Sequence, residues 1–382
     1  MKNTDRNNAS PGTTFIPGAL QTAVQYHQSG QLPQAQMLYQ QVLRADPTQP
    51  DALHLLGLIE HQLGNSAFAV DLIQRAIKIR PYAAMYYFNL GNTLQDMGQL
   101  DEAIACFRKA ISLQPNFPDA SYNMGNALKA QCQLDKAIAS YQQSLLFNPG
   151  FAEAQLKIGN TLLDLGRLDE AIASYRRTLL LKPDYVEAHF NLGNALFAKG
   201  HVDEAIASYR RALVLKPDDV GTICNCAKAL MVQGQADEAI AGYRRAILLK
   251  PDETIARTGL LFALQNLATC SAEELFQEHL RYAERFEAPL KPFWRPHPNS
   301  RDPERRLKVG YVSGDFCNHP VAYFFEPILA CHDKSVVEIY GYCNNTQHDN
   351  YTERIAAEVD HWLVCSSLSD EQLAERIRAD GI

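Results

Sequence analysis

The chain has 382 residues, a formal net charge of −7 and 46% hydrophobic residues, the composition of a globular protein long enough for two or more domains. Its repeated part has no lysine- or arginine-rich run, which argues against a nucleic-acid partner. The polar start, "MKNTDRNNASPGTT", is not a signal peptide, and no apolar run has membrane-spanning length. Nine scattered cysteines without a CxxC pair argue against a disulfide framework and a zinc site. We therefore expect a cytoplasmic protein that binds no membrane, no nucleic acid and no metal.

A 34-residue period runs through most of the chain, and a period of this length indicates a stacked array of structural repeats. One position of the repeat holds proline, at Pro47, Pro81, Pro115, Pro149, Pro183, Pro217 and Pro251. A second position holds glycine, at Gly57, Gly91, Gly125, Gly159 and Gly193. A third position is aromatic in six copies, at Tyr39, Phe107, Tyr141, Tyr175, Tyr209 and Tyr243. Between the prolines, apolar residues recur at helical spacing in two runs, so each repeat is predicted to be a pair of helices.

The recurring residues have packing roles in this arrangement. Gly200 lies between the two helical runs, where a left-handed C-cap is needed. Gly193 has no side-chain bulk, so we expect its helix to approach the partner helix closely, with Tyr209 filling the space. The proline ends the second helix because it cannot donate into a continuing hydrogen-bond ladder.

The pattern resembles the tetratricopeptide repeat. Seven copies fit, covering residues 16–253, with Cys132 in place of one turn glycine. The resemblance implies an all-α superhelix whose concave groove is lined by the first helix of each pair and binds protein or peptide substrates. We expect residues 1–15 to form a disordered tail, and residues 254–286 to form two helices that cap the array.

Two rows of asparagines fall on the first helices. The first row is Asn89, Asn123, Asn191 and Asn225, interrupted by Lys157. The second row, three residues further along each helix, is Asn92, Asn126, Asn160 and Asn194. Positions three apart share a helix face, and an asparagine can both donate to and accept from a peptide backbone. The rows are therefore candidate peptide-binding residues. The alternative is a structural role in which they bond a neighbouring turn or helix end.

After the repeats the pattern changes. Residues 287–306 are proline-rich and predicted to form an extended linker. In residues 307–382 short β-rich runs alternate with helical runs, which predicts a partial, Rossmann-like α/β lobe with a parallel sheet. Functional loops of such sheets follow the carboxyl ends of strands, and the loop after the first strand is "GDFCNHP".

This loop holds the candidate catalytic residue, His319, flanked by Asp315 and Asn318. Pro320 is suited to a first helical turn, which places His319 at or next to the N-cap of the next helix. A helix N-terminus disfavours the protonated ring, so a neutral imidazole there could accept a hydrogen bond or a proton from a hydroxyl. Asp315 and Asn318 are expected to orient the loop. The alternative is a plain helix cap beside a surface loop.

The strings "RLKVGYVSGDFCNHPVAYF" and "LSDEQLAERIRADGI" resemble the start of the catalytic region of bacterial-type protein O-GlcNAc transferases. The resemblance implies transfer of N-acetylglucosamine from UDP-GlcNAc, as donor substrate, to serine or threonine of proteins chosen by the repeat groove, without a metal or other cofactor. It also implies that His319 lies in the active site, and that the first asparagine row binds substrate.

The α/β segment is expected to hold three strands, and no uridine or diphosphate site can be assigned in it. We therefore expect an incomplete lobe and a chain that by itself does not catalyse the transfer. The alternative function is a peptide-binding tetratricopeptide scaffold without catalysis.

Overall fold

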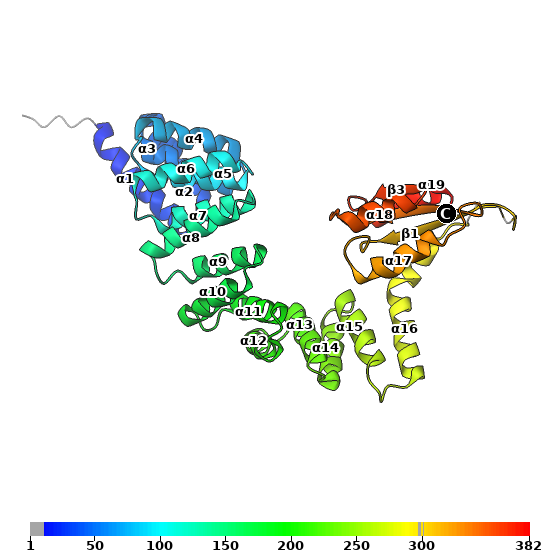
Figure 1. Ribbon diagram of the computed structural model, residues 1–382. Coiled ribbons are helices and arrows are strands. Elements are labelled where there is room, and N and C mark those ends of the chain that lie inside the picture. Colours follow the sequence, from blue (N-terminus) through cyan, green and yellow to red (C-terminus); the bar gives the residue numbers. More distant parts are fainter. Residues whose placement is uncertain (1–10, 297–298, 301) are drawn as a thin grey trace, which may run out of the picture. The chain divides into compact units, whose positions relative to one another are not determined.

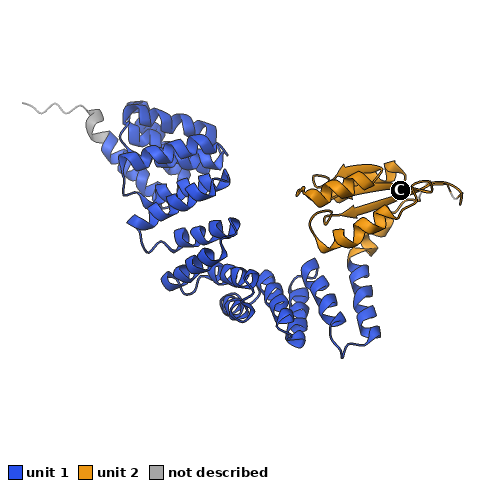
Figure 2. Ribbon diagram, viewed as in Figure 1, with its two compact units in different colours: residues 1–285 blue, residues 286–382 orange. Residues whose placement is uncertain are grey.

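A computed structural model describes residues 11–296, 299–300 and 302–382, in two compact units, residues 1–285 and 286–382 (Figure 2). Of the predicted tail, residues 1–10 lie outside the described residues. The first helix begins at Pro11, so the predicted tail boundary at residue 15 is too late.

Unit 1 is helical throughout its described part (Figure 1). Its fourteen repeat helices form seven consecutive pairs: α1 (Pro11–Gln28) with α2 (Leu32–Ala45), α3 (Pro50–Gln62) with α4 (Ser66–Ile79), α5 (Ala84–Asp96) with α6 (Leu100–Leu113), α7 (Pro118–Ala130) with α8 (Leu134–Phe147), α9 (Ala152–Asp164) with α10 (Leu168–Leu181), α11 (Val186–Ala198) with α12 (Val202–Leu215), and α13 (Val220–Val232) with α14 (Ala236–Leu249). Two further helices follow, α15 (Thr254–Gln265) and α16 (Ala272–Phe286). The predicted tetratricopeptide array is confirmed.

The turn inside each pair depends on a left-handed residue. Gly200, predicted to be such a residue, has φ = 84°. Cys132 occupies the equivalent place in another copy and is in the same region, with φ = 59°. A side chain with a Cβ is strained there, so the fourth pair closes its turn at a cost that the glycine copies avoid.

In four of the pairs, from α5–α6 to α11–α12, the glycine of the first helix lies against the aromatic ring of the second helix. A Cβ built at Gly193 would lie only 2.5 Å from Cε1 of Tyr209, a fully buried ring. The same contact recurs between Gly125 and Tyr141. The predicted close approach is confirmed, and it fixes the distance between the helices of a pair.

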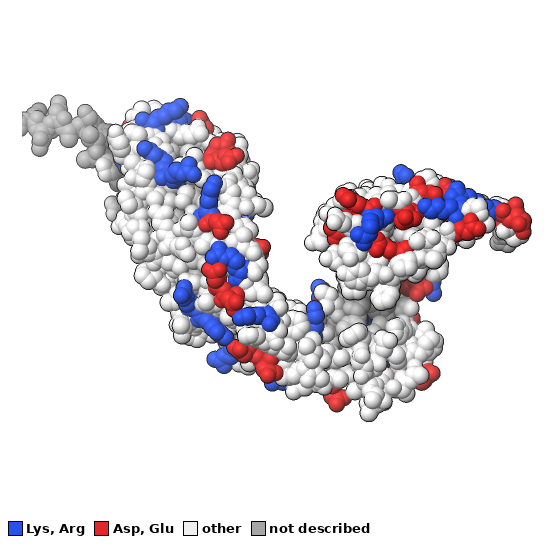
Figure 3. All heavy atoms as spheres, viewed as in Figure 1, with Lys and Arg blue, Asp and Glu red and all other residues white. Residues whose placement is uncertain are grey.

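First helices of neighbouring repeats also contact one another, as α3 does with α5 and α11 with α13. Ion pairs link the second helices, among them Arg176 Nη2 to Glu204 Oε2 and Arg210 Nη2 to Glu238 Oε1, each 2.6 Å. Figure 3 shows acidic and basic side chains interleaved along one face of unit 1. No helix in the described part of the chain combines the length and apolar character that a membrane span requires.

The two expected capping helices differ in how they are held. Helix α15 buries Ala256, Leu260 and Leu264 against the array. Helix α16 has no buried residue and leaves Phe276 exposed. Its links to the array include an ion pair between Arg285 and Asp252. Leu275 of α16 nevertheless packs, partly buried, against the same core, so α15 supplies the fully buried contacts of the cap and α16 adds a partly buried one.

The segment predicted to be an extended linker contains a 3₁₀ helix, Ala288–Phe293. The expectation of an extended conformation is wrong for these residues. Pro289 stands in its first turn, where a missing N–H costs no hydrogen bond.

Unit 2 is a three-stranded parallel sheet with strand order β1 (Leu307–Ser313), β2 (Val337–Cys343), β3 (His361–Val364). Leu307 pairs with Val337, and Tyr340 pairs with His361. The helices between and after the strands are α17 (Pro320–Ala330), α18 (Asn350–Glu358) and α19 (Asp370–Asp380).

Helices cover both faces of this sheet. Side chains of successive strand residues point to opposite faces, and Ile339 packs with Leu329 of α17 and Ile355 of α18. Its neighbour Tyr340 lies in a second cluster with Leu373 of α19. The predicted partial α/β fold is confirmed.

Candidate functional site

The two asparagine rows are hydrogen-bonded to each other across the repeat boundaries. Asn123 Nδ2 donates to Asn92 Oδ1 of the preceding repeat at 2.8 Å. Asn191 donates to Asn160 at 2.9 Å in the same way. Asn225 then donates to Asn194 at 3.0 Å. All members of both rows are half-buried.

Second-row oxygens also accept hydrogen bonds from the aromatic position of their own repeat. The hydroxyls of Tyr141, Tyr175 and Tyr209 donate to Asn126, Asn160 and Asn194 at 2.8–2.9 Å. Burial raises the pKa of these tyrosines, so their hydroxyls stay protonated and remain donors. The second row is thus bound into the repeat packing, and its predicted peptide contact stays a prediction.

At the start of the first row, Asn89 Nδ2 lies 2.8 Å from Nε2 of His54. Burial, the largest cause, lowers the pKa of His54 to about 4, while Asp51 raises it and His27 lowers it further. The ring is therefore neutral near pH 7, and its Nε2 accepts the hydrogen bond from Asn89. His54 thus accepts the hydrogen bond of Asn89, as the second-row asparagines accept those of the other first-row residues. The sequence pattern did not indicate this role for His54.

Each of these bonds uses one N–H of a first-row amide. In the described part of the chain no hydrogen bond reaches the amide oxygens of Asn123, Asn191 and Asn225, so each oxygen and one N–H remain for a ligand. A carbonyl acceptor beside an N–H donor matches the N–H and C=O of a peptide backbone. The second row aligns these amides because it holds each in one orientation.

The candidate loop in unit 2 places His319 as predicted, at the N-cap of α17. Its Nδ1 accepts from the backbone N–H of Val321, 3.3 Å away. The side chain is 45% exposed, so a substrate can reach it. A neutral ring that accepts at Nδ1 carries its proton on Nε2.

Asp315 and Asn318 flank the histidine in different ways. Asp315 Oδ2 lies 3.8 Å from Nδ1 of His319, too far for a hydrogen bond. Asn318 accepts from the hydroxyl of Tyr323 at 2.8 Å. Its backbone N–H donates to Asp349 Oδ2 at 2.7 Å. Asn318 therefore ties the loop to two helices, and the expected orienting role of Asp315 rests on a longer contact.

The sequence analysis missed the residues that hold this loop from the start of α18, the helix that follows the neighbouring strand β2. Asp349 caps α18, and backbone hydrogen bonds, from Thr352 first and then Asn318, lower its pKa. Thr352 Oγ1 donates to the backbone oxygen of Phe316 at 2.8 Å. The sequence did contain an indication of these residues. Asp349 and Thr352 have the spacing of a capping box, and they follow a strand that ends at the same edge of the sheet.

Within the described residues, no group of three or more histidine, cysteine or acidic side chains is arranged to hold a metal ion. What the loop offers a substrate is an imidazole, an amide and a carboxylate at the carboxyl end of β1.

Comparisons with known proteins match both units. The model of the family described as Glycosyl transferase family 41 matches residues 284–382. Models described as Tetratricopeptide repeat match residues 23–84 and 156–220, 84–117, 118–151 and 196–261.

Among curated proteins, the chain is similar to the UDP-N-acetylglucosamine--peptide N-acetylglucosaminyltransferase of Caenorhabditis elegans, with 35% identity over 80 residues, 20% of this chain and 7% of that protein. The probable enzyme of this name called SEC, from Arabidopsis thaliana, is 33% identical over 79 residues, 20% of this chain and 8% of the relative. The matched segments thus span less than a tenth of the length of these two relatives.

A solved structure of a mutant O-GlcNAc transferase from Thermobaculum terrenum is similar with 33% identity and a TM-score of 0.51, covering 60% of this chain and 44% of that one. Stacked helix pairs followed by an α/β segment with a histidine-capped loop therefore define a tetratricopeptide-repeat protein with a glycosyltransferase-like C-terminal segment. The chain is a tetratricopeptide-repeat protein whose residues 284–382 match Glycosyl transferase family 41, and it is similar to O-GlcNAc transferases.

Proposed function

We propose that the chain forms the substrate-binding part of a protein O-GlcNAc transferase. In the transfer, a serine or threonine oxygen bonds to the anomeric carbon of N-acetylglucosamine, and the bond from that carbon to UDP breaks. UDP leaves with the bonding electron pair, and the hydroxyl proton is released. The relatives named as peptide N-acetylglucosaminyltransferases support this substrate pair.

The observation that carries the proposal is the orientation of the first asparagine row. Each of Asn123, Asn191 and Asn225 is held by one N–H and leaves its carbonyl oxygen unpaired within the described residues. Three repeats of the array therefore present equivalent amides to an extended polypeptide, with Lys157 interrupting the row between Asn123 and Asn191. These amides bind its backbone, so the array accepts many sequences and positions their hydroxyl side chains for transfer.

In unit 2, His319 contacts the reacting groups through Nε2, because Nδ1 is engaged by the N-cap contact. The proton on Nε2 makes the neutral ring a hydrogen-bond donor to a substrate oxygen. As a proton acceptor at Nε2, His319 would first have to move its proton to Nδ1 and lose the contact with Val321. Asp315 is the residue that would favour that tautomer, from 3.8 Å.

The second candidate function is a peptide-binding scaffold without catalysis, favoured by the same amide rows. A transfer assay separates the two. The whole product of the gene that encodes residues 1–382 is incubated with UDP-GlcNAc radiolabelled in the sugar and a serine- and threonine-rich acceptor protein.

We expect label in the acceptor from the wild-type protein, and a loss of about 100-fold or more in His319→Ala, in the range of a lost catalytic proton-transfer or electrostatic group. Acceptor binding should be unchanged in this variant. Absence of label from the wild-type protein would favour the scaffold, and wild-type turnover in His319→Ala would remove the role of the histidine.

A further inference from the structure

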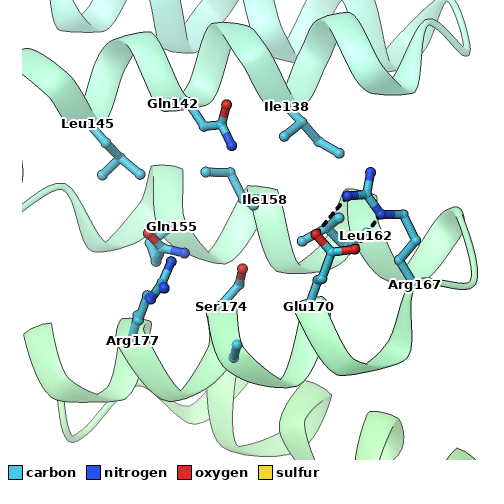
Figure 4. A pocket seen from close by; sticks show the side chains of 11 residues that line it. Ile138, Gln142, Leu145, Gln155, Ile158, Leu162, Arg167, Glu170, Ser174 and Arg177 are labelled. Atoms are coloured by element: carbon cyan, nitrogen blue, oxygen red, sulfur yellow. Dashed lines mark hydrogen bonds and ion pairs between the residues drawn. The ribbon is translucent and has the colours of Figure 1, made fainter.

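A cavity of about 330 Å³ lies between α8, α9 and α10, at the boundary of two repeats. Figure 4 shows Glu170, Ser174 and Arg177 of α10 on one side of it, facing Gln142 and Leu145 of α8.

The cavity opens away from the asparagine rows. Gln155 lines it, and Lys157 holds the first-row position of the same helix. Residues two apart on an α-helix point about 200° apart. The cavity is therefore separate from the proposed substrate-binding face.

A matched cavity of about 260 Å³ occurs two repeats further on, between α12, α13 and α14. There an ion pair between Arg210 and Glu238, 2.6 Å long, spans the two second helices. In the first cavity Gln142 stands in place of that arginine (142 + 68 = 210). Glu170, the counterpart of the glutamate, instead receives two hydrogen bonds of 2.6 Å from Arg167 of its own repeat. The first cavity therefore has no ion pair at this position between its second helices, α8 and α10.

A second ion pair is also missing from the first cavity. In the later one, Arg245 donates to the backbone oxygen of Pro217 at 2.8 Å and lies 3.4 Å from Asp218. Gly150 stands at the position equivalent to that aspartate (150 + 68 = 218). Arg177, the counterpart of Arg245, has no ion pair or hydrogen bond within the described part of the chain. Arg177 lines the cavity, and Glu170, the acidic residue of the same lining, is hydrogen-bonded to Arg167.

Two buried polar side chains complete the lining. Gln155 is 8% exposed and Ser174 is 4% exposed, and neither side chain has a hydrogen-bond partner among the residues that the structure describes. Their counterparts in the later cavity are Ile223 and Gly242, which have no side-chain hydrogen-bonding group. Because both residues line the cavity and their polar atoms are not sealed inside the protein, the two groups are available to hydrogen-bond a ligand that enters it.

The rest of the lining is apolar and includes Ile138, Ile158 and Leu162. A guanidinium, an amide and a hydroxyl can all donate, and the positive charge of Arg177 favours an anionic acceptor. Arginine with a carboxylate is the strongest such pair, since it forms two parallel hydrogen bonds. The volume is at the low end of ligand pockets, which are about 300–1,000 Å³, so it suits one residue rather than a nucleotide or a lipid.

We propose that this cavity binds the C-terminal residue of a peptide, with the carboxylate on Arg177, Gln155 and Ser174 and an aliphatic side chain on the apolar floor. A C-terminal leucine, isoleucine or valine carries a carboxylate and an aliphatic side chain on the same α-carbon. The site would let the array hold a second protein while a substrate occupies the asparagine rows.

The test is calorimetric titration of the 382-residue chain with the peptide acetyl-Ser-Gly-Ser-Leu, as free acid and as C-terminal amide. We expect the free acid to bind at least tenfold more tightly than the amide. Arg177→Gln should remove this preference, and Arg245→Gln, whose arginine already has partners, is the matched control that should keep it. The double variant Gln155→Ile with Ser174→Gly, which installs the residues of the later cavity, should weaken the free acid at least tenfold at unchanged circular dichroism.

Equal binding of acid and amide, or an unchanged preference in Arg177→Gln, would overturn the site. Binding of 4-methylpentanoate as tightly as the peptide would overturn the peptide as its occupant.

Discussion

Asn123 donates a 2.8 Å hydrogen bond to the amide oxygen of Asn92 in the preceding repeat. Asn92 therefore holds the side chain of Asn123 in place. The amide oxygen of Asn92 is occupied by this bond, while the amide oxygen of Asn123 is unpaired within the described residues. Two rows that look equivalent in sequence therefore have different roles. The second row holds the repeats, and the first row is the one that we propose to bind the ligand.

The second row should contribute to stability in proportion to the donors that each oxygen accepts. Asn160 and Asn194 each accept from a tyrosine and an asparagine, whereas among the residues that the structure describes Asn126 accepts from Tyr141 alone. Substitution by alanine leaves each donor without its partner at about 1 kcal/mol apiece, so Asn160→Ala should cost about 2 kcal/mol and Asn126→Ala about 1 kcal/mol. Urea unfolding followed by circular dichroism measures the difference. Equal losses at the two positions would show that the donors find other partners.

The buried imidazole of His54 should make the array sensitive to acid. Its folded pKa, lowered by burial to about 4, lies below the unfolded value of 6.5. The unfolded chain therefore binds more protons between these values, and stability falls as the pH drops through this window. Between pH 7 and pH 5 the loss from this residue is about 2 kcal/mol.

His54→Gln keeps an acceptor for Asn89 and removes the titration. The difference in unfolding free energy between wild type and variant, measured at both pH values, isolates the contribution of His54 from that of the carboxylates. A difference that does not change with pH would contradict the burial argument.

The close contact between Gly193 and the ring of Tyr209 should not tolerate a methyl group at residue 193. A Cβ at residue 193 would lie 2.5 Å from a ring that the core holds in place, and such overpacking costs about 1–3 kcal/mol. Gly193→Ala should lower the midpoint of thermal unfolding despite the better helix propensity of alanine. Gly221→Ala is the control, because its Cβ would meet nothing closer than 3.8 Å. An undiminished midpoint in Gly193→Ala would mean that the helices can move apart freely.

The neutral ring of His319 should carry its proton on Nε2, because Nδ1 accepts from Val321. Long-range ¹H–¹⁵N spectra of histidine-labelled protein identify the tautomer, with His319→Asn to assign the signal. The same tautomer should persist in Asp315→Asn. A proton on Nδ1 in the wild type that moves in this variant would show that Asp315, rather than the helix cap, sets the tautomer.

Periodicity predicted the array well because each repeat packs mainly on its neighbours, so that one spacing specifies every interface. Pro320 likewise placed His319 at a helix start. The hydrogen bond from Asn123 to Asn92 was not predictable, since it depends on the rotation between successive repeats. The bond from Asn318 to Asp349 was not predictable either, because it requires the register of two parallel strands that lie far apart in the sequence.

The central claim is that the first asparagine row holds an extended substrate. It is tested most directly by fluorescence anisotropy of a labelled, unstructured serine- and threonine-rich peptide titrated with the 382-residue chain. The variant that replaces all four residues by alanine (Asn89, Asn123, Asn191 and Asn225) should bind at least tenfold more weakly at unchanged helicity. Wild-type affinity in that variant would contradict the account.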